Sequence, residues 1–195
     1  MKELVKSGVI GKITGADAEM AIPKMFGDDD IRFQYDLGGG ATMDLGCEYM
    51  RPSPREASKL NELGYAISCV RYVLDAEPTG IVKIAVNKHH HERIDRSLRA
   101  IFDMPNDVTS SIYCDFSMPK RSILGPLPFF RWLPRLPSFR INVIGEEGEI
   151  CLENFLVPSI YHYITITKRK ETKTIKAYTG ENLTNPAKGE AWWST

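Results

Sequence analysis

The sequence has no excess of either charge. Lys and Arg together number 25, and Asp and Glu also number 25, so the formal net charge at pH 7 is +0. A protein that holds a polyanion normally presents a surplus of positive charge. The balance therefore argues against nucleic acid as a partner.

Long apolar runs are also absent. No stretch approaches the roughly 18 apolar residues of a membrane span, and the start MKELVKSGVIGK lacks the apolar core of a signal peptide. We therefore expect no membrane partner and a cytoplasmic location. The 195 residues, 43% hydrophobic and 26% charged, have the composition of a folded protein.

Cysteines are few, and the common catalytic signatures are missing. The four cysteines show no CxxC pattern, so we expect reduced, buried thiols and neither disulfides nor structural zinc (Cys47, Cys69, Cys114 and Cys151). GxSxG, HExxH, a phosphate loop and the GxGxxG of a dinucleotide site do not occur. Residue patterns alone therefore assign no reaction.

Alternating apolar and polar residues are present and predict a series of strands. GEEGE (145–149) and PND (105–107) are turns so short that the strands they join must be antiparallel. The sequence thus predicts an α+β fold with an open, largely antiparallel sheet and helices on one face. The predicted strands are 9–22, 81–86, 96–102, 108–116, 139–144, 149–152, 160–167 and 172–178.

Helical segments accompany these strands. Residues 1–7 are typical of the last turns of a helix that stops at Gly8, and a second helical pattern runs from Tyr65 to Leu74. Gly38–Gly40 allow a close approach before a helix start at Ala41. The first segment looks like the end of a longer helix and GEAWWST has no closing element, so we expect a piece of a longer protein.

Two runs of polar residues invite a metal hypothesis. The aspartates 28–30 lie in a loop over 23–36, but calcium loops space their carboxylates at alternate positions, so a solvated loop is the favoured interpretation. The histidines 89–91 would bind metal only if their rings converged, and adjacent residues on a strand point in alternating directions. We therefore expect no metal ligands.

GGGATMDLGC (38–47) followed by YAISCVRYVLDAEP (65–78) resembles the segment that opens the C-terminal domain of the Gfo/Idh/MocA oxidoreductases. SGVIGKIT, IDRSLRAIFDMPNDVTSSIYCDF and INVIGEEGEICLENF are similar to this family too. The branch of fungal D-xylose dehydrogenase and dimeric dihydrodiol dehydrogenase is the most similar. The resemblance implies that residues 1–195 form one C-terminal substrate and oligomerisation domain, with the family's Rossmann domain missing.

The resemblance also implies an activity and partners. It points to an NAD(P)-dependent dehydrogenase that moves a hydride from a CH–OH group of a sugar or diol to NADP or NAD, and to a homodimer formed through the sheet face. Because the nucleotide-binding domain is absent from this chain, we expect it to be inactive alone. The alternative is a non-catalytic binding or oligomerisation module, which would use the sheet face and the proline-rich residues 117–139.

Three site residues follow from the family pattern. Asp44 matches an aspartate that orients substrate, Tyr65 matches the acid or base of this branch, and Arg32 matches a basic residue near the pocket. The alternatives are a surface ion pair for Arg32 and simple packing for Tyr65. In the family the aspartate and the acid or base stand four positions apart, whereas here they are 21 apart. The 17 residues 48–64 are an atypical insert that resembles a retained intron or a gene-model error.

Overall fold

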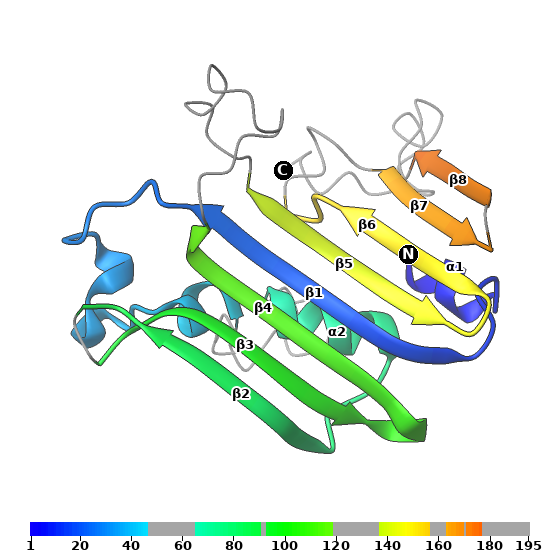
Figure 1. Ribbon diagram of the computed structural model, residues 1–195, viewed down its shortest axis with the longest axis horizontal. Helices are drawn as coiled ribbons and strands as arrows, with labels where there is room; N and C mark the ends of the chain where they lie inside the picture. Colours follow the sequence, from blue (N-terminus) through cyan, green and yellow to red (C-terminus); the bar gives the residue numbers. More distant parts are fainter. Residues whose placement is uncertain (47–64, 91–92, 119–136, 157–162, 170, 177–195) are drawn as a thin grey trace, which may run out of the picture.

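The described residues form an eight-stranded sheet (Figure 1). The computed structural model describes residues 1–46, 65–90, 93–118, 137–156, 163–169 and 171–176. The strands are β1 (Ile13–Pro23), β2 (Gly80–Lys88), β3 (Asp95–Met104), β4 (Val108–Met118), β5 (Ser138–Gly145), β6 (Gly148–Glu153), β7 (Tyr163–Lys168) and β8 (Glu171–Lys176).

The strand order is β2-β3-β4-β1-β5-β6-β7-β8. Within this sheet β1 and β4 are parallel, and every other neighbouring pair is antiparallel. β1 therefore lies at the centre and has β4 and β5 as neighbours, although both come about a hundred residues later. The predicted open, largely antiparallel sheet is confirmed.

The α-helices lie on one face of this sheet, as predicted (Figure 1). α2 (Ala66–Leu74) packs on β1, β4 and β5, and α1 (Lys2–Lys6) packs on α2. Gly8 ends the α1 region with a φ of 71°. Shorter helical turns are η1 (Ile31–Phe33), η2 (Tyr35–Leu37), the π-helical η3 (Thr42–Gly46) and η4 (Pro105–Asp107). In the described part of the chain, no helix has the length and apolarity needed to cross a membrane.

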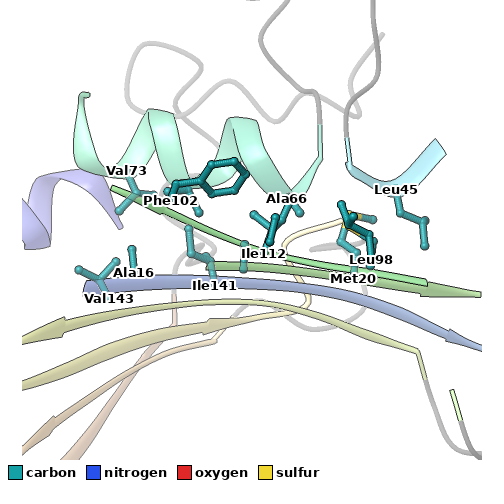
Figure 2. Close-up of a cluster of buried hydrophobic side chains, with 14 of the residues drawn as sticks. Ala16, Met20, Leu45, Ala66, Val73, Leu98, Phe102, Ile112, Ile141 and Val143 are labelled. Atoms are coloured by element: carbon teal, nitrogen blue, oxygen red, sulfur yellow. The ribbon is translucent and has the colours of Figure 1, made fainter. Parts of the chain in front are cut away.

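The hydrophobic core lies between the sheet and α2. Alternate residues of a strand point to the same side, and in β1 these are the buried Ala16, Ala18 and Met20. Burying one Val or Ile side chain fully contributes about 1.5–3 kcal/mol to stability. Figure 2 shows the packing of Ala66 and Val73 of α2 with the sheet residues Phe102, Ile112, Ile141 and Val143.

The first strand begins four residues later than predicted. Ile10 fits the alternation and is fully buried, but residues 9–12 form a turn, and Gly11 has a φ of 74°. This turn is held by hydrogen bonds from the backbone N–H groups of Glu146 and Glu147 to the carbonyl oxygens of Lys12 and Ile10, at 3.0 and 2.9 Å. Ile10 thus fits the apolar pattern because its side chain is buried at the β5–β6 turn, and not because it belongs to a strand.

Thiol reactivity tests this packing. Cys69, Cys114 and Cys151 are free thiols, as expected, but only Cys114 is buried, whereas Cys69 and Cys151 are partly exposed; Cys47 lies outside the described residues. Burial raises the pKa of the Cys69 thiol to about 12, and burial with the neighbouring Glu153 raises that of Cys151 to about 12. At pH 8 we expect iodoacetamide to label both roughly a thousandfold more slowly than an ordinary thiol. Peptide mass spectrometry measures each site, and labelling as fast as in urea would contradict this packing.

Candidate functional site

Aromatic side chains attach the loop after β1 to the sheet. The rings of Phe26 and Phe33 meet the ring of Phe116 on β4 edge to face, with centroids 5.9 and 5.6 Å apart. Phe33 and Phe116 are buried. Such pairs stabilise a contact by about 0.5–1.5 kcal/mol beyond the area they bury. Arg32 precedes Phe33 in the chain, so its backbone is fixed to the sheet through the Phe33–Phe116 contact.

Gly39 and Gly40 bring this loop close to its own backbone. The N–H groups of Gly39 and Gly40 donate to the carbonyl oxygens of Gln34 and Arg32, at 2.9 and 2.8 Å. A Cβ on Gly39 would lie 2.6 Å from the Arg32 carbonyl oxygen. Gly40 has a φ of 127°, and a Cβ there would collide with the Asp95 carboxylate. The glycine run thus serves the close approach predicted for it.

Asp95, at the start of β3, holds the segment that carries Asp44. Its carboxylate accepts hydrogen bonds from the backbone N–H and the hydroxyl of Thr42, each at 2.7 Å. This satisfies an N–H that a helix start otherwise leaves without a partner. The sequence analysis missed Asp95. One feature of the sequence could have indicated such a residue. No Ser, Thr, Asp or Asn stands just before Ala41 to cap the helix start, so a capping side chain from elsewhere in the chain was to be expected.

Arg32 and Asp44 lie together in an ion pair, which is the contact that the alternative interpretation of Arg32 predicted. The Arg32 Nε is 3.4 Å from Asp44 Oδ2, and its Nη1 is 3.0 Å from Asp30 Oδ1. The guanidinium also lies 4.1 Å from the centroid of the Phe26 ring. Hydrogen bonds from the backbone N–H and then the guanidinium of Arg32 lower the pKa of Asp30 below its ordinary value. The result is a fixed arginine between two carboxylates.

This cluster remains open to a ligand. The side chains of Arg32 and Asp44 are 35% and 44% exposed. A half-exposed carboxylate can accept hydrogen bonds from hydroxyl groups, and a guanidinium can donate to their oxygens. The arrangement is therefore suited to orient a polyhydroxylated molecule.

Tyr65 stands at the start of α2, next to the segment of Asp44. It is half-buried against the core, and its carbonyl oxygen accepts from the Cys69 N–H at 3.0 Å. α2 contacts η3, and Figure 2 shows Leu45 and Ala66, the sequence neighbours of Asp44 and Tyr65, on the same face of the sheet. The structure thus places the three predicted site residues on adjoining elements. Residues 48–64 lie outside the described part.

The described residues do not provide a dinucleotide site. Phosphate groups are normally held by backbone N–H groups at a helix start that follows a buried strand. Here the N–H groups of Gly39 and Gly40 already donate within the loop, and the glycines follow 3-10 turns instead of a strand. This glycine run is therefore not arranged to hold the phosphate groups of NADP or NAD.

A surface hollow between α1 and the end of α2 lies apart from the predicted site residues. Ion pairs occupy it: Lys2 Nζ is 2.7 Å from Asp75 Oδ1, and Arg71 Nη2 is 2.5 Å from Glu77 Oε1. The hollow has mainly polar walls and none of the predicted site residues lines it. Its side chains are engaged with each other, so we assign no ligand to it.

Among solved structures with this fold is the 3-ketoreductase KijD10 from Actinomadura kijaniata, in complex with NADP and TDP-benzene. Its TM-score is 0.61 at 18% sequence identity, over 89% of this chain and 43% of that chain. The aldose-aldose oxidoreductase from Caulobacter crescentus, complexed with glycerol, has a TM-score of 0.60 at 14% identity, over 91% of this chain and 44% of that chain. Neither a family model nor a curated protein matches the sequence.

These comparisons concern the fold. The open sheet with helices on one face is the fold that this chain shares with part of each of these two oxidoreductases. The chain spans less than half the length of the two solved proteins it is compared with.

Proposed function

We propose that this chain is the substrate-binding part of an NAD(P)-dependent oxidoreductase that acts on a CH–OH group of a sugar or vicinal diol. D-xylose and trans-dihydrodiols are the first substrates to test, because the sequence resembles the dehydrogenases that use them. The observation that carries the proposal is the Arg32–Asp44 pair, 3.4 Å apart, with Asp44 on η3, which contacts α2. The fold it shares with two oxidoreductases, one solved with NADP and one with glycerol, supports it.

The proposed roles follow from the chemistry of each side chain. Arg32 donates hydrogen bonds to a substrate oxygen, and its contacts to Asp30 and Phe26 keep the guanidinium in place. Asp44 accepts from a substrate hydroxyl and orients the carbon that reacts. Tyr65 takes the hydroxyl proton as that carbon is oxidised. A tyrosine with the ordinary pKa of about 10 is a poor base at neutral pH, so it needs a cation nearby during the reaction.

The hydride acceptor would be bound outside the described residues, since their glycine run offers no phosphate site. These residues would then bind and orient substrate but lack the partner that the redox step requires. The isolated chain is therefore expected to bind the substrate without oxidising it.

The isolated chain is expected to produce no NADPH from D-xylose or a trans-dihydrodiol. Absorbance at 340 nm measures this directly, and any turnover that depends on Tyr65 would contradict the assignment of the nucleotide site to another domain. Sugar binding, followed by saturation-transfer NMR, is expected for the unchanged chain and for the remote control Asp103→Asn. It is expected to weaken roughly tenfold in Asp44→Asn, since one charged hydrogen bond is lost. Equal binding by both variants would overturn the proposed role of Asp44.

The second candidate function is an oligomerisation module that uses the open face of the sheet as a homodimer contact. This face is polar: Arg140 Nη2 on β5 is 2.8 Å from Glu19 Oε2 on β1, and the Ser111 hydroxyl donates to Asp17. In a symmetric dimer the same surface patch of each chain meets its copy at a two-fold axis. Charged side chains on this face would then form ion pairs with those of the second copy. A sizing column in the same experiment separates the candidates: a dimer that binds neither sugar nor cofactor favours the module, and sugar binding favours the substrate domain.

A further inference from the structure

Three potential metal ligands meet where the loop after β1 lies beside the β2–β3 turn (Figure 1). They are Asp28 in the loop, and His89 and His90 just after β2. Each offers one ligand atom, and these atoms all lie within 4.8 Å of one another. Within the described residues, the three come from two chain segments about sixty positions apart.

His89 is the fixed member of this group. Its side chain is only 5% exposed, and its ring stacks on Phe33 with centroids 4.4 Å apart and planes at 6°. Its backbone N–H donates to the Ile94 carbonyl oxygen at 2.8 Å, which closes the turn. A buried ring held on two sides presents its nitrogens in a defined direction.

His90 and Asp28 complete the group from the solvent side. The His90 ring centroid is 3.9 Å from that of His89, with planes at 46°. The Nε2 of His89 is 3.6 Å from Asp28 Oδ1. The histidines were predicted to diverge, because neighbouring residues on a strand point in alternating directions. That rule does not apply here, since β2 ends at Lys88 and the turn brings both rings to one side.

Asp28 also forms an ion pair with Lys24, whose Nζ is 3.5 Å from Asp28 Oδ1. An exposed carboxylate of this kind is negatively charged at neutral pH and able to act as a ligand. Lys24 is also a competing cation, although both partners of this ion pair are more than half exposed and it can swing away.

We propose that Asp28, His89 and His90 bind a divalent transition-metal ion of the Zn²⁺ type. Two imidazole nitrogens and one carboxylate oxygen form a ligand set that suits such ions, whereas Mg²⁺ and Ca²⁺ prefer oxygen ligands alone. At Zn–N and Zn–O lengths of about 2.0–2.2 Å, ligand atoms lie about 3.3 Å apart. The His89–Asp28 separation of 3.6 Å is near this value, and the exposed His90 and Asp28 side chains would close the remaining gap of up to about 1.5 Å.

A bound ion would have two local effects. It would connect the loop that carries Arg32 to the turn between β2 and β3, so the loop would be held at both ends. With three protein ligands it would also keep a fourth position for water or another oxygen ligand on the exposed side. The proposal does not depend on the dehydrogenase function, because it rests on this cluster alone.

Zn²⁺ binding to the full chain tests the proposal, provided that no polyhistidine tag is present. The chain is first stripped with a chelator, and affinity is measured by competition with a fluorescent zinc indicator. We expect one ion per chain. Asp28→Asn and His90→Ala are each expected to weaken binding roughly a hundredfold, since removing even a supporting group costs about 10–100-fold. Asp29→Asn, which makes the same charge change one residue away, is expected to bind as tightly as the unchanged chain.

His89→Ala is less informative, because loss of the ring stacked on Phe33 can unfold the turn. Thermal unfolding is therefore measured on the other variants, which keep this ring. A hundredfold excess of Zn²⁺ over its Kd is expected to raise the melting temperature by about 5–10 °C in the unchanged chain and in Asp29→Asn, but not in Asp28→Asn. Mg²⁺ is expected to have no effect. If Asp28→Asn bound Zn²⁺ as tightly as the unchanged chain while His91→Ala lost affinity for Zn²⁺, the ion would be bound by the histidine run alone. That result would overturn the proposal. So would the absence of Zn²⁺ binding below the millimolar range.

Discussion

Deletion of residues 48–64 is expected to raise the melting temperature by about 5–10 °C. η3, which carries Asp44, and α2 are in contact with each other, so a connection between them does not need a long loop. Closing a loop of 17 residues costs roughly 2.5 kcal/mol of chain entropy, from (3/2)RT ln n. In a protein of this size, each kcal/mol shifts the melting temperature by about 2–4 °C. Circular dichroism at 222 nm follows the transition.

The control for this deletion keeps the length and changes the sequence. When residues 48–64 are replaced by a Gly/Ser linker of equal length, the melting temperature is expected to stay within about 2 °C of the unchanged chain, because the loop entropy stays the same. A deletion variant that melts lower than the unchanged chain would show that these residues stabilise the fold. That result would also contradict their interpretation as an insert.

The same deletion bears on the proposed site. It would place Asp44 and Tyr65 four positions apart, which is one helical turn, so both side chains would project in one direction. In the unchanged chain they lie on two separate elements, η3 and the start of α2, and these two elements are in contact. A site that depends on packing between two separate elements is less precisely held than one on a single helix, and an error of about 1 Å can cost a hundredfold in rate.

The strands were predictable because one face of the sheet is buried. In β4 the buried residues Ser110, Ile112 and Cys114 alternate with more exposed ones, and this is the pattern that sequence periodicity detects. β2 was found for another reason. Its residues are exposed along nearly its whole length, including Ile81 and Val82 at 62% and 57%, so composition and not alternation identified this edge strand.

The pairing of elements was not predictable, because periodicity says which side of a strand is buried and not what lies beside it. β1 pairs in parallel with β4, and the register places Ala18 opposite Ile112. The Asp95 cap on Thr42 and the meeting of Asp28 with His89 depend on the same kind of long-range placement. The family resemblance supplied Asp44, Tyr65 and Arg32, and the sheet topology supplies their neighbours.

Gly40→Ala is expected to destabilise the protein by about 2–4 kcal/mol. A residue with a side chain is strained at a φ of 127°, which costs about 1–3 kcal/mol. The new Cβ would also displace the Asp95 carboxylate from the Thr42 N–H and hydroxyl, and the loss of such a cap costs about 0.5–2 kcal/mol. Urea unfolding followed by tryptophan fluorescence measures the change in the free energy of unfolding.

Two other glycines separate these causes. Gly38 has a φ of 75° but open space around its Cα, so Gly38→Ala is expected to cost only about 1 kcal/mol, for the left-handed backbone alone. Gly27 has open space and no positive φ, so Gly27→Ala is expected to stay within about 0.5 kcal/mol of the unchanged chain. If Gly40→Ala were no worse than Gly38→Ala, the Asp95 contact would not hold the segment of Asp44. Gly40→Ala is expected to be the most destabilising of the three variants only if the Asp95 carboxylate holds the segment that carries Asp44.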